Sequence, residues 1–279
     1  MQKRVAAIHD ISCFGKCSIT VALPLISAAG IETAVIPTAV LSTHTAGFKD
    51  YTFRDLTEDI IPVAKHWKSE GITVDAVYSG YLGSKEQIDL VGEAVDYMKN
   101  DDTIFVVDPV MADHGVLYGG FAPDFPLEMK RLCAKADVIT PNITEACFMT
   151  GTEYKSAPYE KEYIENLVMA LSKITNGKIV LTGVAFNEQE MGAACYENGK
   201  IEYIFSKKVD AMYHGTGDIF TSVLTAAILR GKTLSSSAQL ASDFTADCIK
   251  LTKESYPEMT YGVNFEAKIP DLLKMLGIC

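Results

Sequence analysis

The 279 residues contain 48% apolar and 22% charged side chains, a composition typical of a globular protein rather than of a disordered or fibrous one. The chain carries 25 basic and 36 acidic residues, and its net charge of −11 disfavours binding to nucleic acid or to anionic membrane surfaces. If the substrates are anions, a local feature such as backbone N–H groups or a divalent cation must offset this charge.

At the N-terminus, His9 and Asp10 interrupt the apolar run after four residues, which is too short for a secretory signal. No apolar stretch approaches the roughly 18 residues that a membrane span needs. Seven cysteines form an odd set without a C-x-x-C pair, so the sequence predicts neither a disulfide framework nor a zinc knuckle. We therefore expect a cytoplasmic protein with reduced thiols.

Along the chain, short apolar segments rich in β-branched residues alternate with longer segments of helical periodicity. This alternation is typical of repeated β–α–β units around a parallel sheet, and it predicts an α/β protein. The expected strands are 4–9, 33–40, 74–79, 103–108, 136–140 and 178–182. The expected helices between them are 18–30, 54–70, 84–100, 125–134 and 142–151.

After the sixth expected strand the pattern changes. Segments 191–196 and 201–207, joined by Glu-Asn-Gly, predict a hairpin and therefore an antiparallel edge to the sheet. Two further helices are expected over 217–230 and 234–253. Because no repeat or flexible linker divides the chain, we expect a single domain over residues 1–279.

The segment Gly215-Thr216-Gly217-Asp218 lies directly before an expected helix. Ligands of a parallel sheet bind outside the carboxyl ends of its strands, and polar residues gather at most of these ends. Here two glycines allow backbone N–H groups to approach an anion, and the helix N-terminus adds its positive dipole end. Asp218 alone would equally well stabilise the first helical turn, so the spacing leaves an anion site and a simple helix start both open.

Three further polar residues follow expected strands. Asp108 follows an apolar strand and precedes a proline, while Asn142 and Glu145 open the next helix with the spacing of an N-cap. Helix capping alone therefore explains Asn142 and Glu145 as well as a ligand role does. Together with the 215–218 turn, these acids favour a phosphate bound with Mg²⁺, which uses few protein carboxylates and completes its shell with water and phosphate oxygens.

Four segments occur in one order along the chain: Ser79-Gly80-Tyr81-Leu82-Gly83-Ser84, Asp108-Pro109-Val110-Met111, Thr140-Pro141-Asn142 with Glu145, and Gly215-Thr216-Gly217-Asp218. In this order they resemble the pyridoxal kinase branch of the ribokinase-like family over nearly the whole chain. The last segment is shared by sugar, nucleoside and vitamin kinases, whereas the first, with Ser42-x-His44-Thr45, points to the vitamin B6 branch. The resemblance implies a three-layer α/β/α sandwich, with no separate lid domain because the chain lacks a long β-rich insertion near its N-terminus.

The resemblance also implies a role for each matching residue on the phosphate side. Asp218 would be the general base that accepts the proton of the substrate hydroxymethyl group as it attacks the γ-phosphate of ATP. The backbone N–H groups of Gly215, Thr216 and Gly217 would hold the transferring phosphoryl group. The triphosphate and Mg²⁺ would be surrounded by Asp108, Asn142 and Glu145, with Asp108 and Glu145 serving the metal and Glu145 acting through a water molecule.

The remaining implied contacts concern the nucleotide and the vitamin. Thr182 and Gly183 would contact the nucleotide, and Asp10, Thr45 and Tyr81 would line the pyridine pocket. The family likeness further implies a homodimer and leaves a monovalent cation such as K⁺ open. The Gly-rich segment 111–121 lies beside the expected phosphates, and we interpret it as a flap that excludes water.

Two departures from the family pattern bear on the substrate. Pyridoxal kinases usually carry a serine where this chain has Asp10; an acid there resembles the hydroxymethylpyrimidine kinases, and it would also suit a protonated amine or ring nitrogen. Some bacterial relatives carry a cysteine that traps the pyridoxal aldehyde just before the Gly-x-Gly-Asp turn, where this chain has His214. Three hypotheses follow: a B6 vitamer kinase, a hydroxymethylpyrimidine (phosphate) kinase, or a catalytically silent sensor of nucleotide or vitamer.

Overall fold

A nine-stranded sheet forms the centre of the protein, whose computed structural model describes residues 2–279. Its strands lie in the order β11-β10-β9-β8-β5-β4-β1-β2-β3. Their bounds are β1 (Arg4–Ser12), β2 (Glu32–Leu41), β3 (Phe53–Asp55), β4 (Ala76–Ser79), β5 (Ile104–Val107), β8 (Val138–Ile139), β9 (Lys178–Val184), β10 (Glu190–Glu197) and β11 (Lys200–Lys207).

The strands from β9 to β2 in this order pair in parallel, as the alternating sequence pattern predicts. At one edge β10 and β11 pair antiparallel, which confirms the predicted hairpin. At the other edge the short β3 also pairs antiparallel, with β2. The sequence did not predict β3, because all three of its residues are exposed and leave no apolar pattern.

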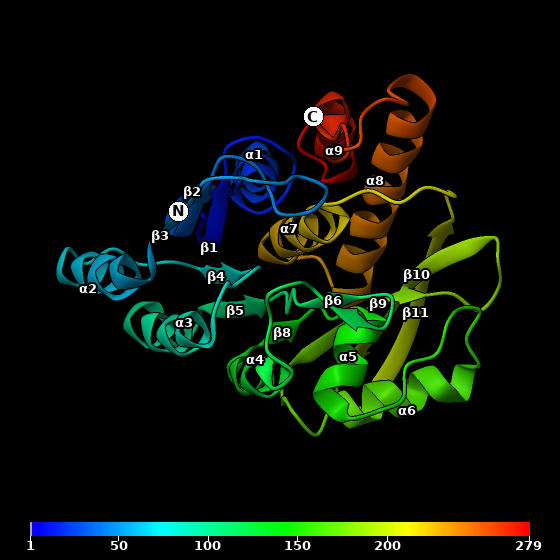
Figure 1. Ribbon diagram of the computed structural model, residues 1–279, viewed down its shortest axis with the longest axis horizontal. Helices are drawn as coiled ribbons and strands as arrows, with labels where there is room; N and C mark the ends of the chain where they lie inside the picture. The colour runs from blue at the N-terminus through cyan, green and yellow to red at the C-terminus, as the bar shows by residue number, and fades with distance from the viewer. Residues whose placement is uncertain (1) are drawn as a thin grey trace.

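Helices cover both faces of the sheet, so the molecule has three layers (Figure 1). In Figure 1, α1, α7, α8 and α9 lie above the row of strands, and α2 to α6 lie below it. Their bounds are α1 (Ile19–Ala28), α2 (Ile60–Ser69), α3 (Lys85–Met98), α4 (Phe125–Lys135), α5 (Ile143–Thr150), α6 (Lys161–Leu171), α7 (Thr216–Leu229), α8 (Leu234–Ser255) and α9 (Ile269–Met275). This arrangement confirms the predicted α/β/α sandwich.

The central strands are buried on both faces. Along β1, Val5 and Ala7 pack into the core beneath α1 and α7, whereas Ala6 and Ile8 pack into the core on the α2 to α6 side. A strand buried on both faces needs a continuous apolar run rather than an alternating one. This explains why the first strand reads as uninterrupted apolar sequence up to His9.

Some elements differ from the predicted boundaries. The expected helix 54–70 begins at Ile60, because its first residues form β3 and a 3₁₀ turn, Thr57–Asp59. A second 3₁₀ turn, Glu266–Lys268, leads into α9. Within residues 2–279, the strands outside the main sheet are β6 (Ala112–Asp113) and β7 (Val116–Leu117), a short ribbon rather than a lid domain.

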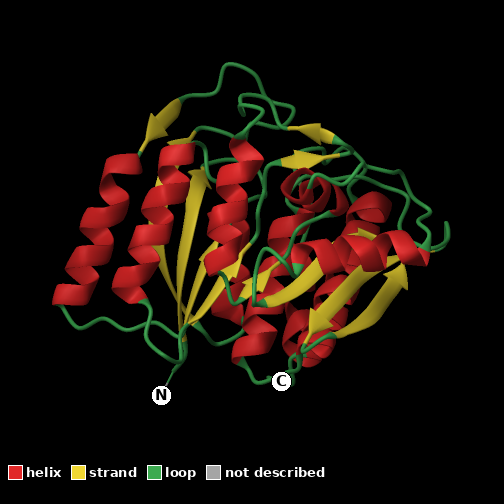
Figure 2. Cartoon of the chain, turned by 90° about the horizontal axis from the view of Figure 1, so that it is seen from below, coloured by secondary structure: helices red, strands yellow, loops and turns green. Residues whose placement is uncertain are grey.

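The order of the strands fixes where a ligand would bind. β2 and β4, which follow β1 along the chain, lie on opposite sides of it, so the order reverses between β1 and β4. A crevice opens at such a point, outside the carboxyl ends of the strands. Figure 2 shows long loops gathered along the edge of the sheet opposite the N-terminus, which is this carboxyl edge.

Candidate active site

Asp10 and Tyr81 flank the point where the strand order reverses. Ile8 of β1 pairs with Ser79 of β4, and Asp10 and Tyr81 each lie two residues after a member of this pair. The Asp10 side chain is buried, with 4% of its surface exposed, and one carboxylate oxygen accepts a hydrogen bond from Ser12 Oγ at 2.9 Å. Burial raises the pKa of Asp10, although hydrogen bonds from Ser18 and Ser12 oppose the shift.

Tyr81 is half-buried and lies near this carboxylate. Burial raises the pKa of its hydroxyl to about 12, and the negative charges of Asp10 and Tyr51 contribute. The ring of Tyr81 lies 5.7 Å from that of Phe121, whose ring stacks on Phe125. An aromatic ring therefore lies near a buried acid at this edge of the sheet.

Thr45 lies on the loop between β2 and β3, where its side chain is exposed. Among residues 2–279 that side chain has no hydrogen-bond partner, so its predicted contact with a substrate stays a prediction. Its neighbour His44 is buried instead: Nε2 lies 3.1 Å from the Tyr261 carbonyl oxygen, and the ring lies 5.7 Å from that of His214.

The Gly215-Thr216-Gly217-Asp218 turn forms the start of α7. Gly215 has a φ of +80°, and a Cβ at this position would lie 1.9 Å from the Lys16 carbonyl oxygen. Glycine is therefore required both for the backbone conformation and for the close packing of loop 12–18 against the helix N-terminus. A Cβ on Gly217 would lie 3.7 Å from Asp108 Oδ2, which places the turn beside that carboxylate.

Asp218 lies in the first turn of α7, and its side chain is half-buried. Burial raises its pKa to about 7, opposed by a hydrogen bond from the Ser18 backbone and reinforced by the negative charge of Asp10. Cys17 lies close to both acids: burial raises the pKa of its thiol to about 12, and the charges of Asp218 and Asp10 add to the shift.

Asp108 lies directly after β5 and is buried, with 5% of its surface exposed. Its Oδ2 accepts a hydrogen bond from Thr221 Oγ1 of α7 at 3.1 Å, and Thr221 Oγ1 lies 3.0 Å from Thr140 Oγ1. Burial, and then the negative charge of Asp218, raises the pKa of Asp108 to about 8. The carboxyl group is thus held beside the Gly215–Asp218 turn, at a cost in stability when it ionises.

Asn142 and Glu145 form a true capping box at the start of α5. Asn142 Oδ1 accepts from the Glu145 backbone N–H at 2.9 Å, and Glu145 Oε2 accepts from the Asn142 N–H at 2.8 Å. Glu145 Oε1 also accepts from the Met111 N–H at 3.1 Å, and Asn142 Nδ2 donates to the Ala112 carbonyl at 2.8 Å. The pair therefore caps the helix and fixes the base of the β6–β7 ribbon.

Glu145 is nonetheless unusual for a capping residue. It is buried, with 3% of its surface exposed, and burial followed by the charge of Asp108 raises its pKa well above its usual range. Among the described residues no ion pair includes Glu145, Asp108, Asp218 or Asp10. Within residues 2–279, each of these four acids therefore lacks a cationic side chain to neutralise it.

Thr182 and Gly183 lie within β9, which extends two residues beyond the predicted strand end. The Thr182 backbone N–H donates to the Pro141 carbonyl at 2.9 Å, and Thr182 forms an isolated bridge with Asn142. Gly183 has a φ of +77°. Both residues therefore adjoin the capping box, on the side of the sheet edge away from Asp10.

The β6–β7 ribbon corresponds to the predicted flap. Its tight turn contains His114 and Gly115, both at positive φ, and the Gly115 N–H donates to Thr144 Oγ1 at 3.0 Å. Tyr118, just after β7, was not singled out by the sequence. Burial raises the pKa of its hydroxyl, and the negative charges of Glu145, Asp113, Asp108 and Asp218 add to this shift.

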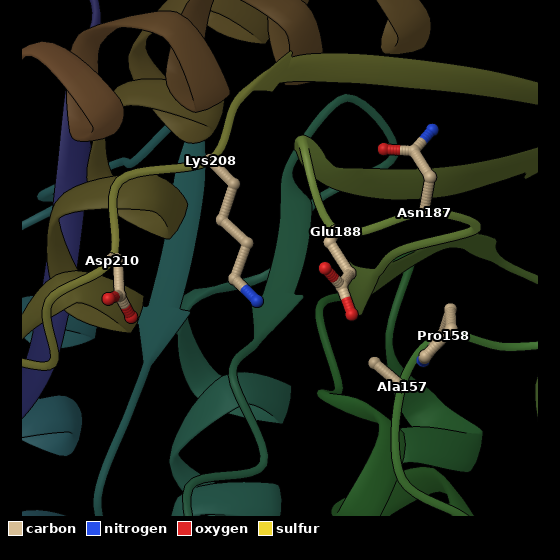
Figure 3. Close-up of a pocket in the computed structure, with 6 residues that line it drawn as sticks. All are labelled: Ala157, Pro158, Asn187, Glu188, Lys208 and Asp210. Carbon is tan, nitrogen blue, oxygen red and sulfur yellow. The ribbon is translucent and has the colours of Figure 1, made fainter.

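A cavity of about 400 Å³ lies beyond this edge, where the connections after β9 and β11 approach the segment after α5 (Figure 3). In Figure 3, the side chains of Lys208 and Glu188 both extend into the space between these segments. The chain continues from Lys208 to the Gly215 turn, and from Gly183 to Glu188. The lining residues are Ala157, Pro158, Asn187, Glu188, Lys208 and Asp210.

Other classes of site find no support in the described part of the chain. No group of three or more His, Cys, Asp or Glu side chains is arranged there to hold a metal ion. None of the helices within residues 2–279 is long and apolar enough to cross a membrane. The seven cysteines are all free thiols in the structure.

Comparison with known proteins identifies the family. Residues 19–263 match the model of the phosphomethylpyrimidine kinase family. A pyridoxine kinase of Bacillus subtilis is 29% identical over 203 residues, which are 69% of each chain. The crystal structure of a pyridoxal kinase from Lactobacillus plantarum superposes with a TM-score of 0.90 at 28% identity, covering 99% of this chain and 98% of that one.

A Bacteroides thetaiotaomicron protein gives a similar result. Its crystal structure, solved in an orthorhombic form with pyridoxal, has a TM-score of 0.91 at 33% identity and covers 98% of this chain and 96% of that one. These two crystal structures thus share the fold and nearly the full length of the protein described here. The chain therefore belongs to the phosphomethylpyrimidine kinase family and, among the ribokinase-like kinases, to the pyridoxal kinase branch.

Proposed function

We propose that this kinase transfers the γ-phosphoryl group of ATP to the 5-hydroxymethyl group of a B6 vitamer. The observation that carries the proposal is the position of Asp218. Its carboxyl group lies in the first turn of α7, directly after the Gly215–Gly217 turn, and burial together with the negative charge of Asp10 raises its pKa to about 7. A carboxylate that titrates near neutral pH is suited to accept a proton from an alcohol.

In this proposal the substrate oxygen forms a bond to the γ-phosphorus while its proton passes to the Asp218 carboxylate. The bond between the γ-phosphorus and the bridging oxygen breaks, and ADP leaves. Backbone N–H groups of Gly215, Thr216 and Gly217 stabilise the charge on the transferring group, aided by the dipole of α7. Catalysis rests mainly on alignment, because phosphoryl transfer asks little covalent chemistry of the protein.

The acids near this turn fit a divalent cation that is shared with phosphate. Asp108 and Glu145 are buried and lack a cationic partner among residues 2–279. Mg²⁺ would supply charge neutralisation between the phosphates and these carboxylates. Because both oxygens of Glu145 already accept backbone N–H groups, Asp108 is the better direct ligand and Glu145 would act through water.

We place the nucleotide along Asn142, Thr182 and Gly183, with its base end toward the 400 Å³ cavity that Lys208 faces. We place the vitamer ring between Tyr81 and Asp10, with Thr45 at the mouth of the pocket. Tyr81 offers an aromatic face to a flat heterocycle. The names of the relatives from Bacillus subtilis and Lactobacillus plantarum support a B6 vitamer as the substrate.

We also propose that residues 1–279 form one kinase domain, that the protein is a homodimer, and that it acts in the cytoplasm. The single sheet that runs through the described residues supports the first proposal. The free cysteines suit a reducing compartment. Light scattering coupled to size-exclusion chromatography tests the dimer, which a monomeric mass would refute.

The test of the function is an ADP-release assay with Mg²⁺ and ATP on pyridoxal, pyridoxamine, pyridoxine and hydroxymethylpyrimidine, with and without K⁺. We expect turnover of at least one B6 vitamer with a higher kcat/KM than hydroxymethylpyrimidine, because specificity is a ratio of transition-state affinities. Preference for hydroxymethylpyrimidine would replace the proposed substrate. Tight binding of ligands without any turnover would instead support a sensor.

A further inference from the structure

Asp10 is a buried acid whose charge the protein itself does not balance. Its side-chain hydrogen bonds come from neutral serines, Ser12 Oγ at 2.9 Å and Ser18, and no ion pair in the part of the chain described here includes it. The basic residue of its own loop, Lys16, pairs with Glu266 at 2.5 Å, and its ammonium lies 5.5 Å from the centre of the Phe265 ring. A buried carboxylate without a partner is unfavourable, so it takes up a proton or a cationic ligand.

The titratable groups that face Asp10 do not remove this imbalance. Cys17, Asp218 and Tyr81 are acids, and each can only add negative charge. His44 is the base that acts on Asp10, and its Nε2 already lies 3.1 Å from the Tyr261 carbonyl oxygen. A cation supplied by the substrate would therefore complement the site.

Asp10 also lies close to the residue that meets the reacting hydroxymethyl group. Loop 12–18, which follows Asp10, packs so tightly on α7 that a Cβ on Gly215 would touch the Lys16 carbonyl. The negative charges of both Asp218 and Asp10 raise the pKa of the Cys17 thiol in this loop, so both acids lie near it. Asp10 therefore lies near Asp218, and we expect a ring substituent next to the hydroxymethyl group to be the one that reaches it.

The B6 vitamers differ at that neighbouring position. Ring position 4, next to the 5-hydroxymethyl group, carries an alcohol in pyridoxine, an aldehyde in pyridoxal and an aminomethyl group in pyridoxamine. The aminomethyl group is an ammonium at neutral pH, whereas the ring nitrogen lies farther from position 5. A carboxylate pairs with an ammonium through charge-assisted hydrogen bonds, which neither an alcohol nor an aldehyde can equal.

We propose that Asp10 makes this enzyme selective for a vitamer with an aminomethyl group at ring position 4, by placing its carboxylate against the substrate ammonium. This inference rests on the proposed function. A charge-assisted hydrogen bond typically changes affinity by about 10- to 100-fold, so kcat/KM for pyridoxamine exceeds that for pyridoxine by about this factor. Asp10 is thus a specificity residue rather than a catalytic one.

The test compares kcat/KM for pyridoxamine and pyridoxine in the wild type, in Asp10→Asn and in Asp10→Ser. Asp101→Asn is the matched control, because it removes one negative charge from an exposed turn after α3. We expect both Asp10 variants to lose about tenfold or more with pyridoxamine and to keep or gain activity with pyridoxine, so that the ratio falls toward one. The control keeps the wild-type ratio.

Two outcomes overturn the inference. The first is an equal loss with both vitamers in the Asp10 variants, which would assign Asp10 to the common ring nitrogen or to the fold. The second is a wild-type enzyme that does not prefer pyridoxamine, a result that needs no variant and so holds even if the variants fail to fold. Failure of the proposed function looks different, because the wild type would then turn over neither vitamer.

Discussion

Gly215→Ala tests whether the packing of loop 12–18 on the anion-binding turn is as tight as the structure indicates. The substitution places an L-residue at a φ of +80° and brings its Cβ within 1.9 Å of the Lys16 carbonyl oxygen. The left-handed conformation costs about 1–2 kcal/mol, and forced movement of packed backbone adds about 1–3 kcal/mol. We therefore expect a loss of about 2–5 kcal/mol in the free energy of unfolding.

Gly231→Ala is a matched control for this prediction. Gly231 has a φ of +81°, but nothing lies within 4 Å of the added Cβ, so this variant carries the backbone strain without the clash. Thermal melts of both variants at one protein concentration separate the two contributions, at roughly 2–4 °C per kcal/mol. Activity should fall in Gly215→Ala alone, because only that variant displaces the anion-binding N–H groups. Equal melting temperatures and an active Gly215→Ala would refute the reasoning.

Four further predictions concern Asp218, Asp108 and Lys208. Asp218→Asn should lower kcat by about 10²- to 10⁴-fold with little change in either KM, and a loss below tenfold would limit Asp218 to electrostatic support. For the wild type, kcat/KM should rise with pH through about 7, since the raised pKa of Asp218 leaves the base protonated below it; a profile flat from pH 5 to 8 would contradict this. In EDTA, Asp108→Asn should be about 1–3 kcal/mol more stable than the wild type at pH 9 but not at pH 4. In the folded protein the pKa of Asp108 is raised from 3.8 to about 8, so the folded state holds a proton that the unfolded state has already lost. As the pH rises through this range the folded protein loses that proton, and its free energy of unfolding falls. A wild-type free energy of unfolding that is equal at pH 4 and pH 9 would refute this prediction. Lys208→Ala should raise KM for ATP about three- to tenfold and leave KM for the vitamer unchanged. An unchanged KM for ATP would show that the nucleotide does not occupy the cavity that Lys208 lines.

The fold could largely be predicted because its signals are local. Apolar runs such as that of β1 and helix starts such as 216–218 follow from a few neighbouring residues. The helix α6 was overlooked although Ile164, Leu167, Val168 and Leu171 recur at helical spacing and are all buried. By contrast β3 leaves no pattern in the sequence, because all of its residues are exposed.

The site could be predicted only in part because it joins segments that are distant in sequence. Spacing could not tell whether Asn142 and Glu145 cap a helix or bind a ligand, and the structure shows a capping box whose acid is also buried beside Asp108. Cys17 and Asp218 lie close together although some 200 residues separate them in sequence, so no local motif could predict their proximity. The experiments above test the proposed roles of Asp10, Asp108, Asp218 and Lys208.

The central claim is that the phosphoryl group moves to the 5-hydroxymethyl oxygen with Asp218 as the base. Phosphorus NMR of a reaction containing the protein, Mg²⁺, ATP and pyridoxamine measures this directly. The account predicts a new phosphomonoester resonance coupled to two methylene protons, rising as the γ-phosphate of ATP disappears and absent over the same time with Asp218→Asn. Release of inorganic phosphate alone, or a phosphomonoester that forms as fast with Asp218→Asn, would contradict it.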